Sequence, residues 1–310
     1  MHPWNEPTLH AFAARRDRLP HAILIHGPRG VGKLALAERA AQMLLCEGAS
    51  KPCDQCDACR WFKAGNHPDF RRVEPEALWP QAEVDEDAPA KRAKQPSIAI
   101  KVDQVRELAH FLYIRSHRGA LRVALVHPAE DMNENAANAL LKGLEEPPAA
   151  AVFILVSHRP AQLLPTIRSR CVAFPVGIPP REAALAWLSA QGLVDAPRWL
   201  AYAGGAPLRA FDYAARGRVD LVPVGDRESL EPLAEALQKL AIDKALLAFG
   251  LPAKYQTTGG QPPSAREWLA FARRMGEDRL LCRHPLNPRL FSAAMLAAMP
   301  SEGREGFGAA

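Results

Sequence analysis

The sequence predicts an α/β domain, a parallel sheet with helices on both faces, followed by a small helical domain and a larger helical domain. Short apolar runs alternate with helical stretches as far as about residue 178. A glycine-rich segment, HGPRGVGK, lies between the first apolar run and a helix rich in Ala and Leu. Beyond residue 178 the apolar residues recur at helical spacing only.

Four buried strands are expected in the first domain, three of them as uninterrupted apolar runs. They are AILIH at 22–26, RVALVH at 122–127, AVFILVS at 151–157, and the later part of 163–176, which begins with a short helix. Helices are expected at 33–45, 102–116 and 133–146. Two prolines end the last of these.

Domain boundaries follow from the change of pattern. We expect a phosphate-loop domain at 1–178, a small helical domain at 179–220 and a helical bundle at 221–310. The proline-rich segment 74–100 changes from acidic to basic and predicts a surface loop near a sheet edge. The tail after residue 300 is expected to fray.

Composition and charge exclude few classes of function. The 310 residues are 48% hydrophobic and carry a formal net charge of +5, which permits contact with nucleic acid without requiring it. No apolar run approaches the roughly 20 residues that span a bilayer. The N-terminus lacks the apolar core of a signal peptide. We therefore expect a cytoplasmic protein that does not contact a membrane.

The glycine-rich segment has the composition of a phosphate-binding loop. Such a loop points successive backbone N–H groups at phosphate oxygens, and its lysine reaches the terminal phosphates. A plain glycine turn between strand and helix is the alternative, but it does not explain a lysine at this offset. The candidate nucleotide-binding residues are Gly27, Pro28, Arg29, Gly30, Val31, Gly32 and Lys33.

Two magnesium ligands are missing from this loop's surroundings. A hydroxyl normally follows the lysine, and an acidic residue normally ends a second strand. Here Leu34 follows the lysine, and His127 and Pro128 end the strand. Glu130 and Asp131 come later, at a spacing that does not suit replacement. ATP binding remains compatible with the sequence, but hydrolysis is not expected.

Four of the six cysteines cluster within 46–59. Cys46, Cys53, Cys56 and Cys59 form a compact set of thiols that suits tetrahedral, structural zinc. Ferredoxin-type iron–sulfur ligation is an alternative, but it places the next cysteine downstream and before a proline. A closed set of four thiolates leaves no open position for a substrate.

These motifs together resemble bacterial clamp-loader subunits of the AAA+ ATPase class. The resemblance rests on LPHAILIHGPRGVGKLALA, the cysteine module, NALLKGLEEPP and LLPTIRSRC, in this order, and covers about residues 19–176. It implies that the helical remainder forms a lid domain at 179–220 and a collar domain at 221–310. It also implies a role in loading a sliding clamp onto primed DNA for DNA polymerase III.

Within that family, the missing magnesium ligands favour a subunit that does not hydrolyse ATP. The implied partners are the gamma or tau motor subunits, the delta subunit, primed DNA and, indirectly or weakly, the clamp. The resemblance assigns Arg170, in the motif SRC, as an arginine finger that acts in the ATP site of a neighbouring subunit. Arg168 is the nearest competitor, and a plain surface arginine is the alternative for Arg170.

Weaker assignments concern two sensor positions and DNA. Ser157 ends the third strand, where the family senses the terminal phosphate, although a structural role is favoured here. The second sensor position falls on Leu208, with Arg209 one residue away. Arg106, Arg115 and Arg118 either face DNA phosphates or belong to a solvated helix face.

Other function classes stay open at the level of sequence. The principal alternative is an active gamma- or tau-like ATPase motor, which an ATPase assay of the isolated chain distinguishes. A zinc-containing nucleotide kinase leaves LLKGLEEPP and SRC unexplained. A zinc-stabilised scaffold that contacts no ATP site is separated from our interpretation by replacing Arg170.

Overall fold

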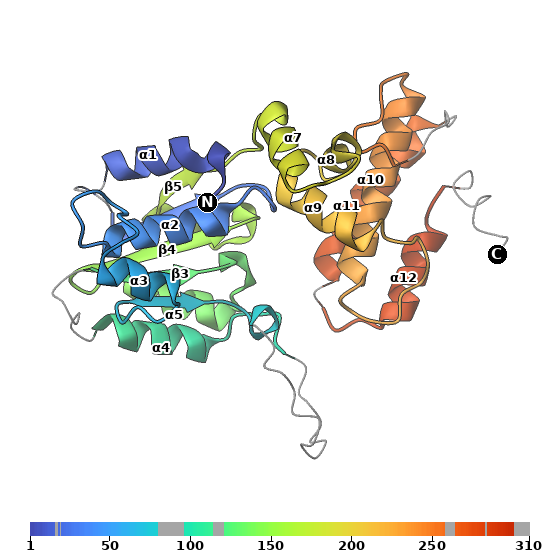
Figure 1. Cartoon of the computed structure of the whole chain (residues 1–310). Helices are drawn as coiled ribbons and strands as arrows, with labels where there is room; N and C mark the ends of the chain where they lie inside the picture. The colour runs from blue at the N-terminus through green and yellow to red at the C-terminus, as the bar shows by residue number, and fades with distance from the viewer. Residues whose placement is uncertain are drawn as a thin grey trace, which may run out of the picture. The chain divides into compact units, whose positions relative to one another are not determined.

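The computed structural model describes residues 1–15, 18, 20–79, 96–113, 121–257, 264–282 and 284–300. The chain divides into two compact units, Met1–Ile178 and Pro179–Ala310. Figure 1 shows the strands together in the first unit and helices alone in the second.

The first unit is built on a five-stranded parallel sheet in the order β2-β3-β4-β1-β5. The strands are β1 (Ala22–His26), β2 (Phe70–Val73), β3 (Arg122–Val126), β4 (Ala151–Ser157) and β5 (Val172–Pro175). In the register of the two central strands, His26 lies opposite Ser157. The C-terminal ends of β1 and β4 therefore meet at the edge where the glycine-rich loop begins.

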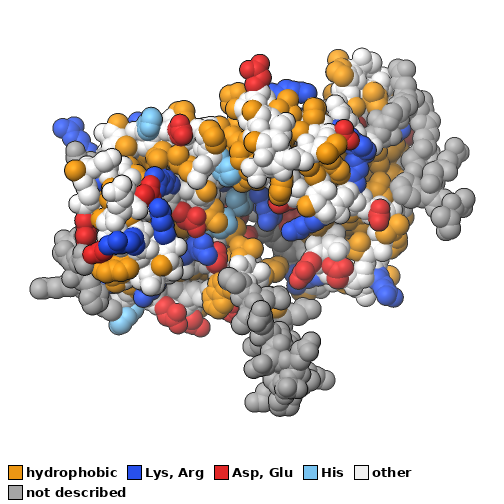
Figure 2. All heavy atoms as spheres, in the orientation of Figure 1, with side chains coloured by type: hydrophobic (Ala, Val, Ile, Leu, Met, Phe, Trp, Pro, Cys, Tyr) orange, Lys and Arg blue, Asp and Glu red, His pale blue; other side chains and the backbone are white. Residues whose placement is uncertain are grey.

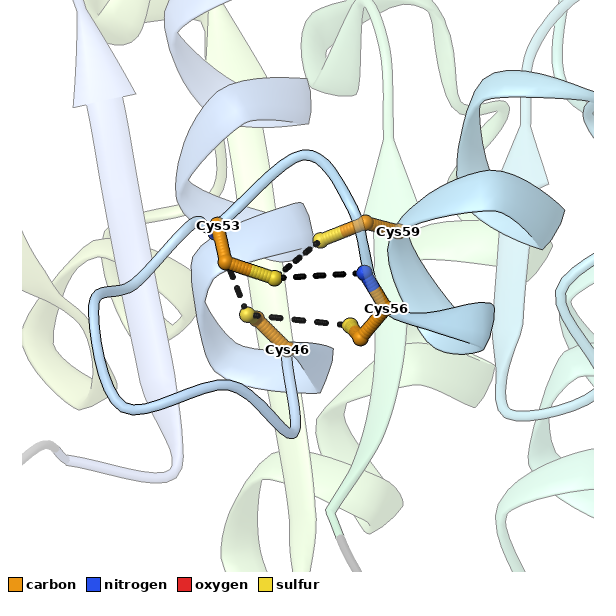
Figure 3. Close-up of side chains that lie close together, drawn as sticks. All are labelled: Cys46, Cys53, Cys56 and Cys59. Atoms are coloured by element: carbon orange, nitrogen blue, oxygen red, sulfur yellow. Dashed lines mark hydrogen bonds between the residues drawn. The ribbon is translucent and has the colours of Figure 1, made fainter.

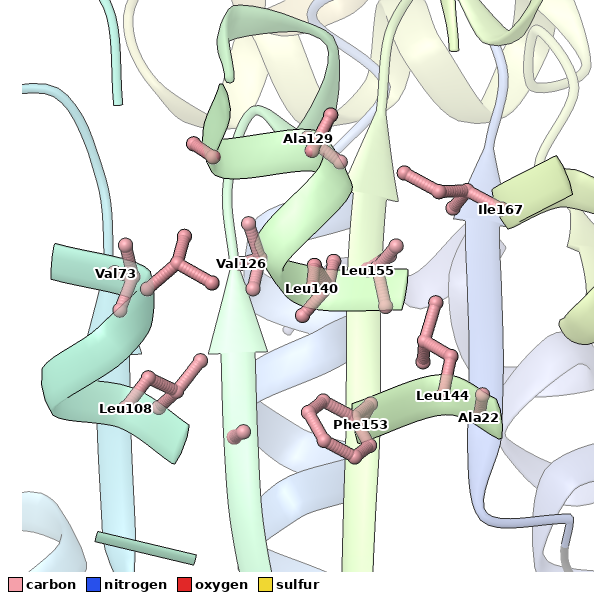
Figure 4. Packing of buried hydrophobic residues seen from close by; sticks show 14 of the residues in the cluster. Ala22, Val73, Leu108, Val126, Ala129, Leu140, Leu144, Phe153, Leu155 and Ile167 are labelled. Atoms are coloured by element: carbon pink, nitrogen blue, oxygen red, sulfur yellow. The ribbon is translucent and has the colours of Figure 1, made fainter. Parts of the chain in front are cut away.

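Helices cover both faces of this sheet, as the sequence predicts (Figure 1). On one face lie α1 (Glu6–Ala14), α2 (Lys33–Leu45) and α3 (Asp57–Lys63). The other face carries α4 (Val102–Tyr113), α5 (Glu134–Glu145) and the short α6 (Pro165–Arg170). The second set packs on a core in which Leu140, Leu144, Phe153 and Leu155 are almost fully buried (Figure 4).

Strand β2 and helices α1 and α3 were not expected from the sequence. Strand β2 adds a fifth strand at the sheet edge and pairs with β3 only. Its residues Arg71 and Arg72 are exposed, so it lacks the apolar run that marks the other strands. Helix α1 contributes Leu9 and Phe12 to the buried interior. Within 74–100, residues 80–95 lie outside the described residues, as does the tail 301–310.

The second unit contains six helices within its described residues. They are α7 (Arg181–Ala190), α8 (Ala196–Tyr202), α9 (Pro207–Arg216), α10 (Leu230–Ala248), α11 (Ala265–Leu281) and α12 (Pro288–Ala297). One apolar cluster joins α7, α8 and α9 around Leu188 and Leu200. Another joins α10, α11 and α12 around Leu237, Trp268 and Met295. The assignment of these helices to lid and collar domains stays a prediction.

Candidate functional site

The glycine-rich loop connects β1 to α2 through backbone that only glycine adopts easily. Gly27, Gly30 and Gly32 have φ values of 146°, 82° and 83°. A side chain at Gly27 would also place its Cβ 1.9 Å from the carbonyl oxygen of Val176. The glycines are thus required by the turn itself, whether or not a phosphate binds there.

The N-terminal segment binds the end of this loop through hydrogen bonds, and the sequence did not predict this contact. Trp4 Nε1 donates a hydrogen bond of 3.0 Å to the carbonyl oxygen of Val31. The buried side chain of Asn5 donates to the same oxygen at 3.0 Å and to that of Gly32 at 3.2 Å. These contacts fix the two residues that precede α2.

Lys33 is the first residue of α2, and its side chain folds over the loop. Its Nζ donates to the carbonyl oxygens of Gly27 at 2.7 Å and Pro28 at 2.5 Å. Burial lowers the pKa of Lys33 to about 8, with Arg29 adding to the shift and Glu130 opposing it. The ammonium group of Lys33 is thus bound by the carbonyl groups at the start of the loop.

The positions expected to hold magnesium offer no suitable oxygen. Leu34 lies half-buried in the first turn of α2. His127 follows β3 and is buried, and burial lowers its pKa to about 4, helped by Lys33, Arg72 and Arg29. His127 is consequently a neutral imidazole at pH 7. Pro128 has no side-chain ligand at all.

Glu130 is nearer to this site than its sequence spacing suggested. The short helix Ala129–Asp131 turns the chain back after β3, and Glu130 Oε1 accepts a hydrogen bond of 2.9 Å from the backbone N–H of His158. Burial raises the pKa of Glu130. Its charge in turn raises the pKa of Lys33.

The four clustered cysteines lie together, as Figure 3 shows. Their Sγ atoms are all within 4.8 Å of one another and could hold a metal ion. The Cys46–Cys56 and Cys53–Cys59 sulfur distances are 3.9 and 4.0 Å. Tetrahedral zinc with Zn–S bonds of about 2.3 Å separates its sulfurs by about 3.8 Å. The donor set and its spacing therefore fit a tetrahedral thiolate site.

Backbone amides support this cluster. The N–H of Cys53 donates to Cys46 Sγ, and the N–H of Cys56 donates to Cys53 Sγ, both at 3.3 Å. Hydrogen bonds from the amides of Gln55 and Cys56 lower the pKa of Cys53 to about 6. Cys53 therefore favours the thiolate, the form that binds metal, whereas burial raises the pKa of Cys59 to about 12.

Arg170 and Arg168 lie on the same short helix but have different surroundings. Arg170 ends α6 and forms an ion pair of 2.7 Å with Glu145, the last residue of α5. It also donates to the carbonyl oxygen of Thr166 at 3.0 Å. Arg168 is exposed, and after burial and Lys33 it is the third influence that lowers the pKa of His26. Arg168 thus acts electrostatically on the last residue of β1, whereas the contacts of Arg170 are with Glu145, Thr166 and Ser169.

The residues near the second sensor position lie on α9. Arg209 points its guanidinium at Glu235 of α10, with 2.6 Å from Nη2 to each carboxylate oxygen. Lys239 Nζ lies 2.8 Å from the same carboxylate, and the pKa of Glu235 falls to about 2 because these two cations outweigh its burial. Arg209 is thus engaged within the second unit, and Leu208 supplies no charge.

Of the three candidate DNA-facing arginines, only Arg106 lies within the described residues. Arg106 is exposed, and its Nη1 lies 3.2 Å from Oδ1 of Asp103, three residues earlier in α4. Arg115 and Arg118 lie outside the described residues. On the visible face of the first unit, basic and acidic side chains lie side by side (Figure 2).

Comparison with known proteins gives these features a family. A family model described as "DNA polymerase III, delta subunit" matches residues 7–178, more than half of the chain. The DNA polymerase III subunit delta' of Pseudomonas aeruginosa is 42% identical over 247 residues, which cover 77% of this chain and 67% of that protein. The chain belongs to the DNA polymerase III delta prime family.

Other delta prime proteins align over similar lengths. The subunit of Escherichia coli is 34% identical over 220 residues, which cover 68% of this chain and 60% of that protein. The subunit of Haemophilus influenzae is 32% identical over 226 residues, with coverage of 71% and 63%. The chain thus spans about two thirds, or less, of the length of these delta prime relatives.

Solved structures resemble this delta prime family member more distantly. A DNA polymerase III gamma subunit-related protein of Thermotoga maritima aligns with a TM-score of 0.48 and 15% identity, over 94% of this chain and 97% of that one. The RuvB Holliday junction branch migration motor of the same organism aligns with a TM-score of 0.39 and 17% identity, over 69% of this chain and 60% of that one.

In the described residues, no helix combines the length and apolar character needed to cross a bilayer.

Proposed function

We propose that this chain is a clamp-loader subunit of DNA polymerase III that does not hydrolyse ATP and completes the ATP site of a neighbouring subunit. Membership of the delta prime family supports the first part. The partners are the gamma or tau motor subunits and the delta subunit, acting in the cytoplasm on a sliding clamp and primed DNA. The parallel sheet with its glycine-rich loop suits the AAA+ class to which such subunits belong.

The observation that carries the proposal is a formed loop that lacks an oxygen ligand at each position where magnesium is normally held. Leu34 and Pro128 have no side-chain oxygen, and His127 is a buried neutral imidazole. Phosphoryl transfer in phosphate-loop enzymes depends on a metal ion held beside the β- and γ-phosphates. A chain with this surrounding is suited to shaping the strand-to-helix turn, and at most to binding a nucleotide, rather than to turnover.

Arg170 is the residue assigned to the neighbour's site. Its side chain is 35% exposed and ends a short helix, so the guanidinium lies at the surface of the first unit. A guanidinium presents several donors in a plane, which suits the charge that develops on a transferred phosphoryl group. Arginine fingers in related systems raise turnover by about 10³–10⁵-fold.

Zinc is the metal we assign to the cysteine cluster. Four thiols with near-tetrahedral spacing match structural zinc sites, and all four positions are supplied by protein. The ion would contribute folding free energy to the knuckle at 46–59. No part in the phosphoryl-transfer chemistry is assigned to it.

Reconstitution tests the proposal. The isolated chain is expected to show no magnesium-dependent ATPase activity. A complex of the motor and delta subunits is expected to hydrolyse ATP in response to the clamp only when this chain is present. Robust turnover by the isolated chain that disappears in Lys33→Ala would identify an active motor instead. Glu130→Gln is the informative companion, because Glu130 is the carboxylate whose charge acts on Lys33.

A further inference from the structure

Asp54 occupies an unusual position between two of the clustered cysteines. Its φ of 60° lies in the left-handed region, which residues other than glycine rarely adopt. Asparagine and aspartate tolerate this region better than most residues. An aspartate at a position that suits glycine indicates that its carboxylate has a role.

The Asp54 carboxylate is the centre of a four-membered network. Arg39 binds it with two parallel hydrogen bonds, Nη1 to Oδ1 at 2.7 Å and Nη2 to Oδ2 at 2.8 Å. Gln42 Nε2 donates to Oδ1 at 3.0 Å, and Lys63 Nζ lies 3.2 Å from the same atom. Paired, charge-assisted bonds of this kind are among the stronger ones in proteins.

These contacts join the same three segments that present the sulfur atoms. Arg39 and Gln42 belong to α2, and Cys46 follows the end of that helix. Lys63 belongs to α3, which also carries Cys59 and begins just after Cys56. Asp54 itself lies in the knuckle with Cys53. One carboxylate therefore fixes the relative positions of all the segments from which the four thiols come.

Charge adds a second reason. Four thiolates around one divalent ion leave a net charge of about −2, which nearby cations stabilise. Asp54 is the main influence that raises the pKa of Arg39, and Cys59 and Cys46 raise it further. The guanidinium that Asp54 holds is thus within electrostatic reach of two of the sulfurs.

We propose that Asp54 is a positioning residue for the metal, and that through Arg39 and Gln42 it controls how firmly the four thiolates retain zinc. The inference rests on the zinc assignment made above. Residues that orient metal ligands from outside the coordination shell commonly change metal affinity by about 10–100-fold when replaced.

A nearby ion pair provides the matched control. Asp57 and Arg60 lie in the same module, 2.5 Å apart, but their side chains are 50% and 69% exposed. Asp54 and Arg39 are 36% and 28% exposed. The Asp57–Arg60 pair also lies within one helix, α3, whereas Asp54 and Arg39 pair across two segments.

The experiment measures zinc transfer from the zinc-loaded full chain to a coloured chelator. Asp54→Asn and Arg39→Gln are expected to release zinc at least about 10-fold faster than the parent. Asp57→Asn should match the parent, and the double variant should release no faster than the faster single variant because the two residues act as one unit. Asp54→Gly removes the carboxylate while suiting the backbone, and it should behave as Asp54→Asn does.

A second measurement separates metal positioning from general structural support. After the metal is stripped, parent and Asp54→Asn should unfold at nearly the same temperature. Parent-like zinc release by Asp54→Asn and Asp54→Gly would overturn the inference alone. An equal loss of stability with and without metal would do the same. A parent chain that binds no zinc would overturn the zinc assignment as well, so the two failures are distinguishable.

Discussion

The guanidinium of Arg170 and the carboxylate of Glu145 lie 2.7 Å apart and join the ends of two helices. Glu145 ends α5, within the motif LLKGLEEPP, and Arg170 ends α6, within the motif SRC. The ion pair thus connects the two motifs through residues that are 25 positions apart in sequence. The pair holds Arg170 beside the end of α5.

Replacing Arg170 with alanine is expected to leave the chain folded, since an exposed arginine contributes little stability. Assembly with other subunits should persist as well. Clamp- and DNA-stimulated ATP hydrolysis should fall by about 10³-fold or more at the site that Arg170 completes. Steady-state ATPase assays of the reconstituted complex, with clamp loading measured in parallel, check this expectation.

Two further variants sharpen that measurement. Arg170→Lys should rescue poorly, because an ammonium cannot reproduce the planar set of guanidinium donors. Arg168→Ala should have a smaller effect than Arg170→Ala. A complex that contains Arg170→Ala and hydrolyses ATP at the parent's rate would favour the scaffold interpretation.

The Glu145–Arg170 pair itself should contribute little to stability. The two side chains are 48% and 35% exposed, and pairs of such exposure are typically worth about 0.2–1 kcal/mol. Urea unfolding of Glu145→Gln, Arg170→Ala and the double variant gives the coupling energy. A coupling above about 2 kcal/mol would show that the pair is a structural brace rather than a holding contact.

Lys33 is expected to destabilise the fold at neutral pH. Its pKa falls from 10.5 to about 8 in the folded chain, so below pH 8 it is charged in both states and the cost of burial is present in full. Between about pH 8 and 10.5 the unfolded chain binds more protons, and stability rises with pH. Lys33→Met should therefore be more stable by about 2 kcal/mol at pH 7.

This difference between parent and Lys33→Met should shrink as the pH rises to about 10. Urea titrations of both chains at pH 7 and pH 10 give the comparison, and groups common to both chains cancel. A constant difference across this interval would mean that the ammonium is not buried at a cost.

Zinc content provides the test of the cysteine cluster. The purified chain should contain about one zinc, and Cys56→Ser should lose most of it together with thermal stability. Cys282→Ser, which alters a buried cysteine outside the cluster, should keep the metal. Elemental analysis decides the matter, and a full metal load after loss of two cluster cysteines would contradict the assignment.

Much of the sheet could be predicted from the sequence because most of its strands are uninterrupted apolar runs. Strands β1, β3 and β4 are of this kind, and β5 was expected within 163–176. Strand β2 escaped because an edge strand with two exposed arginines has no such run. The strand order could not be predicted, since it depends on contacts between β1 and β4 that are more than 100 residues apart.

The candidate site was predictable where chemistry resides in neighbouring residues. The glycine loop and the cysteine cluster are local, and the structure brings each set together. The hydrogen bond between Glu130 and the backbone of His158 joins segments 28 residues apart, so no local pattern could indicate it. The partners of Asp54 and Arg170 come from other elements, so their identity needed coordinates.

Helix α2 has a consequence for how the two local sites depend on each other. Its 13 residues carry Lys33 at one end and lead into Cys46 at the other, a span of about 20 Å. A rigid rod of this length transmits a disturbance from either end. Loss of metal would fray the last turns of α2. The amide protons there would then exchange faster, and this faster exchange would extend towards the loop. The thiol cluster and the glycine-rich loop lie at opposite ends of one helix, so amide exchange along α2 measures how far the loss of metal is felt.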